Sequence, residues 1–141
     1  MVKKSRDEIQ GWEFDWLARD ADGNVALLST AGGGYAPEEF LRDTDLHDAA
    51  IREILALEPS TEAVFAPELA ANLANTWRLV AERGLFAFDA DPSGGPYRLV
   101  AAPRVPRPSS MLPPLAAAAT ARLVLEHVHF ERPLPDVLKF R

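Results

Sequence analysis

The sequence predicts an α+β fold in a single domain of 141 residues: an antiparallel sheet of about five strands, built from two hairpins, with two or three helices packed on one face. Three observations predict it. Residues 12–30 alternate between apolar and polar side chains around a tight turn, residues 44–84 carry apolar stripes at helical spacing, and residues 85–102 contain a second pair of apolar segments. Hydrophobic residues make up 48% of the chain, which is enough for a buried core.

The first hairpin follows from the period-two alternation of residues 12–19. Asp20–Asn24 forms its turn, because Asp-Gly suits the positive φ of a tight hairpin, and Val25–Thr30 is the returning strand. Residues 1–11 show no such pattern and are expected to be a frayed start. The face predicted to be buried consists of Trp12, Phe14, Trp16 and Ala18.

Three helices are expected between the hairpins. Pro37 opens a helical turn, since proline and the acidic Glu38 and Glu39 are favoured at a helix start. Asp43 or Thr44 caps a second helix that runs to about Leu57. A third begins at Pro67 and ends before Gly84. Their apolar stripes are Leu46, Ala50, Ile54 and Leu57 for the second helix, and Leu69, Leu73, Trp77 and Val80 for the third.

The second hairpin pairs Leu85–Asp91 with Tyr97–Ala102. Residues 103–114 hold five of the 12 prolines, which predicts an extended connection. A short helix over Leu115–Ala121 follows. Residues 122–130 are predicted as a strand, with a helix continuing from Leu115 as the open alternative, and apolar residues of the tail 131–141 are expected to dock on the core.

Charge is distributed unevenly along the chain. The net charge is −6, and residues 1–62 hold 14 acidic against six basic residues whereas residues 63–141 hold seven against nine. The densest acidic stretch runs from Glu38 to Glu62. Such a field repels phosphate backbones and anionic lipid, so we expect no binding to nucleic acid or membrane. A solvated acidic face and a surface that binds a basic partner are both consistent with it.

The composition argues against cysteine-based sites, membrane spans and a signal peptide. There is no cysteine, hence no disulfide, thiolate zinc site or cysteine nucleophile. No apolar run approaches the ~20 residues of a membrane span, and no apolar stretch follows the charged N-terminus, so no signal peptide is expected. We therefore expect a cytoplasmic protein.

Four motifs could carry chemistry, and each has a structural interpretation that we favour. Asp20, Asp22 and Asn24 match the first spacings of a calcium loop, but the later positions fail, which favours a hairpin turn. The Gly32–Gly34 run could cradle a phosphate, but Glu38 and Glu39 would repel it. His127 and His129 could share a metal with His47, although structural or surface histidines are commoner. Trp12, Phe14 and Trp16 could stack a base or sugar, but such a stripe is more often core.

No motif for covalent or acid–base catalysis is complete. The chain lacks a G-x-S-x-G elbow, and no pair of carboxylates stands out. We accordingly expect no catalytic residue, no metal and no cofactor.

The opening hairpin also carries a resemblance. The run from Trp16 to Gly32, WLARDADGNVALLSTAG, is followed by a proline and a short acidic helix. Over about residues 12–43 it resembles small bacterial proteins, some of which are immunity partners of secreted polymorphic toxins. The resemblance implies a cytoplasmic, non-catalytic protein that binds and masks a cognate toxin domain, and no catalytic residues carry over.

The leading hypothesis is an immunity-type protein whose acidic segment binds a basic toxin surface. Two other hypotheses stay open: a small enzyme or ligand-binding domain that uses the groove near Gly32–Gly34, and a structural or regulatory subunit of a homo-oligomer. The residues expected to bind the partner are Glu38, Glu39, Asp43, Asp45 and Asp48.

Overall fold

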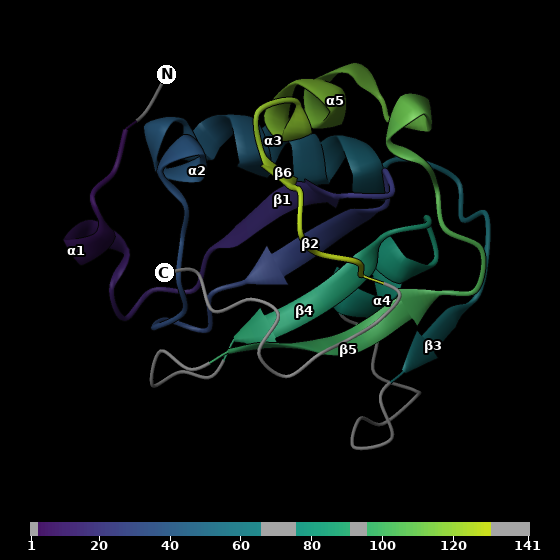
Figure 1. Ribbon diagram of the computed structural model, residues 1–141, viewed down its shortest axis with the longest axis horizontal. Helices are drawn as coiled ribbons and strands as arrows, with labels where there is room; N and C mark the ends of the chain where they lie inside the picture. The colour runs from purple at the N-terminus through teal and green to yellow at the C-terminus, as the bar shows by residue number, and fades with distance from the viewer. Residues whose placement is uncertain (1–2, 66–75, 91–95, 131–141) are drawn as a thin grey trace.

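The computed structural model describes residues 3–65, 76–90 and 96–130, and within them the chain forms one six-stranded sheet and five α-helices (Figure 1). The strands are ordered β3-β5-β4-β2-β1-β6 across the sheet. In chain order the elements are α1 (Arg6–Ile9), β1 (Asp15–Asp20), β2 (Val25–Ser29), α2 (Glu38–Arg42), α3 (Thr44–Leu55), β3 (Ala63–Phe65), α4 (Thr76–Ala81), β4 (Phe86–Ala90), β5 (Tyr97–Pro103), a 3₁₀ turn (Ser109–Met111), α5 (Pro114–Thr120) and β6 (Val124–Leu125).

The α+β class is confirmed, but the prediction of a purely antiparallel sheet of about five strands is wrong. Both predicted hairpins form, β1 with β2 and β4 with β5. The sheet is mixed because β4 pairs with β2 in parallel, and β6 with β1. The parallel pair β2 and β4 is joined by a long connection that contains α2, α3, β3 and α4, and β6 returns to β1 only at the end of the described chain, after α5.

The edge strands were the hardest elements to predict. β3 has only three residues and lies in a stretch to which the sequence analysis assigned no element. Residues 122–130 contribute the two-residue β6 followed by a turn, so the helical alternative is wrong and the strand prediction holds only for Val124–Leu125.

The predicted helices form where the described residues cover them. Asp43 caps α3, accepting a hydrogen bond from the Leu46 N–H, as its position before an apolar stripe predicts. α2 and α5 also match their predicted places. The third predicted helix is seen as α4, while its first part, residues 67–75, lies outside the described residues, as does the docking of the tail 131–141.

The buried face predicted for the first strand is only partly right. Trp16 is fully buried and Phe14 half-buried, but the Trp12 side chain is 68% exposed. β1 begins only at Asp15, because the chain before it turns: the Trp12 N–H donates to the Ile9 carbonyl, and Gly11 has a φ of 84°. Within residues 1–11, expected to fray, α1 forms and the Ile9 side chain is buried.

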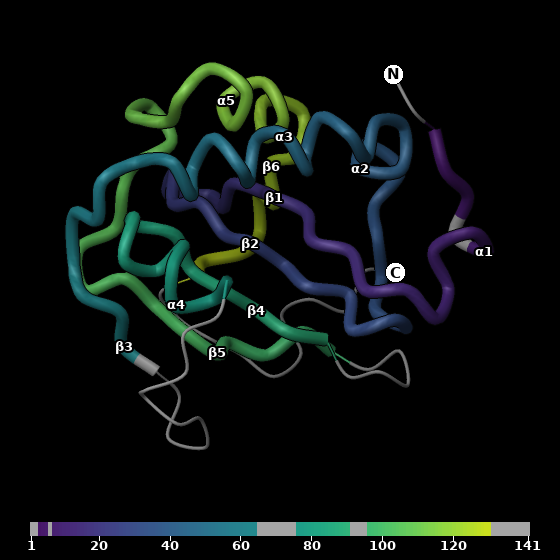
Figure 2. The backbone as a smooth tube through the Cα atoms, turned by 180° about the vertical axis from the view of Figure 1, so that it is seen from behind, coloured from purple at the N-terminus to yellow at the C-terminus, as the bar shows by residue number. Residues whose placement is uncertain are grey.

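Helices cover one face of the sheet. α3 and α5 lie side by side over β1 and β2, and α4 lies against β4 and β5 (Figures 1 and 2). They bury inward-facing residues of the sheet, such as Leu17, Leu27 and Ala87, against Ile54 of α3 and Val80 of α4.

The opposite face is covered as well. Leu123, Val128 and Phe130, which follow α5, pack against strand residues there, and the Phe130 ring contacts the rings of Phe86 and Phe88. Every residue of β2 is therefore buried. In a sheet with one open face, the polar side chains that alternate with core residues point into water. Here helices cover that face, so polar side chains such as Asp15 and Asp89 are partly enclosed, and they form part of the candidate site.

Candidate functional site

The start of β1 and the first turns of α3 enclose a hollow of about 330 Å³. We call it the acidic hollow, because four carboxylates and one ammonium group line it. Its lining residues are Lys4, Glu13, Phe14, Asp15, Phe40, Thr44, Asp45, Asp48 and Ile51.

Helix periodicity places the α3 residues of the hollow. Asp45, Asp48 and Ile51 recur every three residues and so face the same side of the helix. Phe14 and Phe40 supply an apolar surface, and their rings meet edge to face with centroids 6.2 Å apart. The hollow thus combines an apolar aromatic lining with negative charge.

His47 fixes α3 to β1 beside the hollow. Its Nδ1 accepts a hydrogen bond of 3.0 Å from the Leu17 N–H, so the ring proton sits on Nε2, and its ring lies edge-on to Phe40 at 5.0 Å. Burial lowers the pKa of His47 to about 4, which keeps the ring neutral. The role of His47 is structural: it satisfies a backbone donor of β1, and it is not placed with His127 and His129 in a metal site.

Three strands bring a second set of polar residues together next to the hollow. Asp15 of β1 and Asp89 of β4 are the register partners of Ser29 in β2, one on each side. The Ser29 hydroxyl donates to Asp15 Oδ1 at 2.6 Å and accepts from Trp77 Nε1 at 3.1 Å. We call Asp15, Ser29 and Asp89 the carboxylate row.

Both carboxylates of the row resist ionisation. Burial raises the pKa of Asp15, the hydrogen bond from Ser29 opposes this, and Glu13 and Asp48 raise it further. Burial, followed by the charge of Glu13, raises the pKa of Asp89 to about 6. Asp15 belongs to both the row and the hollow, and Glu13 acts on both carboxylates of the row, so the hollow and the row form one electrostatic unit.

The structure divides the five residues predicted to bind a partner. Asp45 and Asp48 line the acidic hollow, and Asp48 also forms an ion pair with Arg52. Glu39 pairs with Arg42 at 2.7 Å, and the Asp43 carboxylate caps α3. Glu38 lies apart from these, in the second hollow described next.

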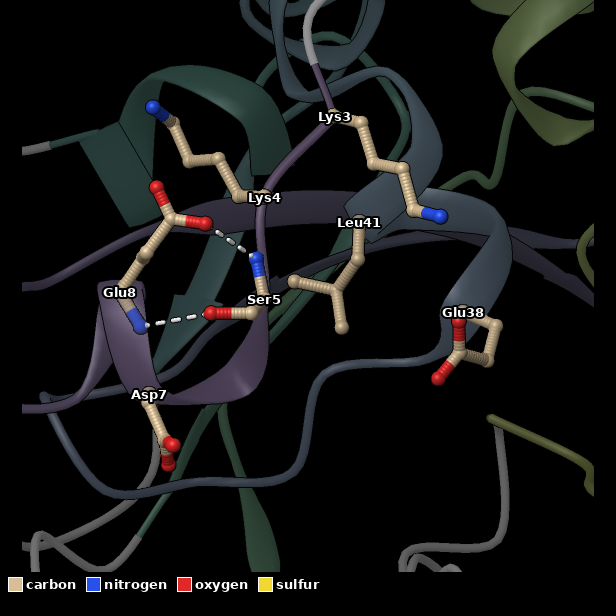
Figure 3. A pocket seen from close by; sticks show the side chains of 7 residues that line it. All are labelled: Lys3, Lys4, Ser5, Asp7, Glu8, Glu38 and Leu41. Atoms are coloured by element: carbon tan, nitrogen blue, oxygen red, sulfur yellow. Dashed lines mark hydrogen bonds between the residues drawn. The ribbon is translucent and has the colours of Figure 1, made fainter.

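A second hollow, of about 460 Å³, lies between the N-terminal segment and α2 (Figure 3). Its polar groups already serve the local fold: Ser5 and Glu8 exchange hydrogen bonds as a capping box at the start of α1. Two lysines and three acids line it, so it has little net charge, and it is the weaker candidate. The lining residues are Lys3, Lys4, Ser5, Asp7, Glu8, Glu38 and Leu41.

Sequence reasoning missed Glu13, Asp15 and Asp89. Glu13 and Asp15 alternate with the side chains predicted to be buried, so the alternation implies an outward face for them, but α3 covers that face. Asp89 lies in the second hairpin, and nothing in the sequence shows that β4 lies beside β2. The sequence does show that Asp15 and Asp89 lie near the ends of predicted strands. In a sheet with both faces covered, carboxylates at such positions become partly buried.

The hairpin turn accounts for the calcium-like motif. Asp20 is buried, and its carboxylate accepts from the backbone N–H groups of Asp22, Asn24 and Phe130. Its oxygens therefore hold the turn and tie it to the segment after β6. His129 Nδ1 lies 2.6 Å from Asp22 Oδ2, and no group of three or more potential metal ligands occurs among the described residues.

The glycine run packs tightly and offers no open cradle. The N–H groups of Gly33 and Gly34, which a phosphate would need, both donate to the Thr30 carbonyl. A Cβ on Gly34 would lie 2.4 Å from the Ala90 Cβ, so glycine is required by a close approach to β4. This removes support from a phosphate site at Gly32–Gly34.

Within the part of the chain that the structure describes, none of the helices combines the length and apolar character needed to cross a membrane. Comparison of the chain with protein-family models, with curated proteins and with solved structures gives no match.

Proposed function

We propose that this chain is a non-catalytic binding protein of the immunity type, which holds a cationic side chain of a basic partner in the acidic hollow. The observation that carries the proposal is the lining of the hollow: four carboxylates against one lysine, beside an aromatic surface. Lysine and arginine have this dual character, because an apolar stem leads to a charged head. The stem would pack on Phe14 and Phe40, and the head would approach the carboxylates.

The electrostatics of Asp15 support the same occupant. Burial and two neighbouring acids disfavour its charge, so a cation placed beside it would relieve that cost. The surrounding negative field would also steer a basic partner towards the hollow. For a toxin with a basic substrate cleft, an arginine or lysine of the cleft is the natural ligand.

The hollow is tested by NMR titration with a small cation, acetyl-Gly-Arg-Gly-amide. We expect saturable shifts of the backbone amides of residues 13–15 and 44–48, and none with the matched citrulline peptide, which lacks the charge. The double variant Glu13→Gln/Asp45→Asn should weaken binding at least threefold. The control Glu58→Gln/Glu126→Gln removes two exposed charges that do not line the hollow and should change little. Equal weakening by both pairs would show that only the overall charge attracts the peptide.

The immunity role needs a protein partner and a separate test. The protein encoded by the adjacent gene should form a complex with the full chain, and its toxicity should be suppressed by co-expression. Glu13→Gln/Asp45→Asn should slow association and flatten its salt dependence. Absence of any complex would reject the immunity role while leaving the cation site to the peptide titration.

A further inference from the structure

The carboxylate row has an unusual distribution of hydrogen-bond donors. Asp15, Ser29 and Asp89 are register neighbours on three adjacent strands, about 4.8 Å apart from one strand to the next. Their positions alternate with Trp16, Leu28 and Phe88 of the opposite core, so all three face the helices. Two carboxyl groups therefore flank a single hydroxyl in a partly enclosed place.

That hydroxyl can serve only one of them. Ser29 has one proton, which it donates to Asp15 Oδ1, and its oxygen accepts from Trp77 Nε1. Asp89 Oδ1 is buried and has no hydrogen-bond partner among the described residues. A buried carboxylate oxygen without a donor is costly, and binding a proton removes that cost.

Among the described residues, the neighbouring charges that shift the pKa of Asp89 are negative, as its own charge is. Glu13 and Asp15 act on it with the same sign, and Asp48 of α3 acts on Asp15. Arg98 is its register partner on β5, but no ion pair joins these two side chains in the described part of the chain. On α4, Arg78 is paired with Glu82. Tyr97 of β5 lies within reach of the Asp89 charge, and burial raises its pKa, so it stays neutral.

We propose that Asp15, Ser29 and Asp89 form a proton-binding site that takes up one proton from solvent in mild acid and thereby lowers the negative charge beside the acidic hollow. No covalent bond between heavy atoms changes: the formal charge of the row goes from −2 to −1, and the protonated carboxyl becomes a donor. The raised pKa of both carboxylates, about 6 for Asp89, agrees with this.

The site has a consequence that rests on the proposed function. A cation in the hollow and a proton on the row compensate the same charges, so each disfavours the other, and the coupling is reciprocal. Binding of acetyl-Gly-Arg-Gly-amide should therefore weaken as the pH falls through about 6, and binding should release protons.

The proton site itself is tested without any ligand. In the full chain, the aspartate carboxyl carbons are followed by NMR between pH 3 and 8, together with the indole N–H of Trp77, which reports on Ser29. We expect the Asp89 carboxyl to titrate with a midpoint near 6 and the Trp77 indole to shift with the same midpoint. Asp15→Asn should lower the Asp89 midpoint by removing a neighbouring charge, and Asp89→Asn should abolish the indole shift. Glu126→Gln, an exposed carboxylate away from the row, is the control and should change neither.

Two results would overturn the proposal. The first is an Asp89 midpoint close to the ordinary value of 3.8. The second is a Trp77 indole N–H whose shift has a different midpoint from that of the Asp89 carboxyl, or persists unchanged in Asp89→Asn. Either observation would show that the three residues of the row do not respond as one unit. Neither result depends on the peptide. Failure of the hollow to bind the peptide would not contradict the proton site, and an ordinary pKa for Asp89 would not contradict the cation site.

Discussion

Replacing His47 by leucine should lower the stability of the protein at high pH but not at low pH. His47 is buried, and its Nδ1 is the acceptor for the Leu17 N–H. Leucine fills a similar volume but leaves this backbone donor unsatisfied. At pH 8, where the ring is neutral in both states, we expect the variant to lose about 1–3 kcal/mol, the usual cost of an unpaired buried donor.

The disadvantage of the leucine variant disappears in acid because the folded parent holds His47 neutral. The pKa of His47 falls from 6.5 to about 4 on folding, so between these values the unfolded state binds a proton that the folded state does not. Stability of the parent is therefore complete above pH 6.5 and is lost as the pH falls towards 4. A shift of this size corresponds to about 3 kcal/mol at 1.4 kcal/mol per pH unit. The leucine variant lacks this loss, so at pH 4 it should be as stable as the parent or more stable.

The assay is urea unfolding of both proteins from pH 4 to pH 8. Only the difference between the two unfolding free energies is interpreted, because the carboxylates titrate equally in both and cancel. His47→Asn is a useful companion variant, since its amide oxygen can take the place of Nδ1 and should preserve part of the pH 8 stability. Parallel pH profiles for parent and leucine variant would refute the assignment of His47 as a buried, neutral acceptor.

Three further predictions concern the core, the turn and the row. Trp16→Ala should cost about 3–5 kcal/mol as a core deletion, whereas Trp12→Ala, at an exposed position, should cost less than about 1 kcal/mol; equal urea midpoints would contradict the burial of Trp16. Asp20→Ala should lower the unfolding free energy by about 2–4 kcal/mol by removing the acceptor of three backbone N–H groups, and Asp22→Ala by much less, as measured by thermal unfolding. Asp89→Asn should raise the free energy of unfolding at pH 8 by about 1 kcal/mol, a value reduced because the Asp89 side chain is partly exposed. This advantage over the parent should disappear as the pH falls from 6 to 4, because in that range the folded parent binds a proton at Asp89 and the unfolded parent does not. An Asp89→Asn protein that is less stable at pH 8 would show that its charge is compensated.

Much of the local structure could be predicted because its signals are local. The alternation around Trp16 and the Asp-Gly turn identify the first hairpin, and Asp43 before an apolar stripe identifies the start of α3. The parallel pairing of β2 with β4 could not be predicted, since a period-two pattern shows which residues share a face but not which strand lies alongside.

The same limit applies to the site. Charge density alone pointed to Asp45 and Asp48, which lie within one helix. Asp15, Ser29 and Asp89 come from three strands, two of which are neighbours only through a crossover. The sequence interpretation placed Asp15 on a solvated face because it assumed that one side of the sheet stays open, but α3 and α4 cover that side.

The position of Asp89 is hard to explain by folding alone. Its β4 neighbours Phe88 and Ala90 are buried apolar residues, and an uncharged asparagine of similar size would avoid the cost of a carboxylate oxygen without a donor. Asp15 at least receives the Ser29 hydrogen bond, whereas Asp89 gains no comparable bond at Oδ1. Groups that lower stability and have strongly shifted pKa values concentrate at functional sites. The charge of Asp89 costs stability at neutral pH, because burial and then the charges of Glu13 and Asp15, which line the hollow with two other acids, raise the pKa of Asp89. Such a charge has a rationale if a cation occupies the hollow, because the cation would compensate negative charge that the fold leaves uncompensated.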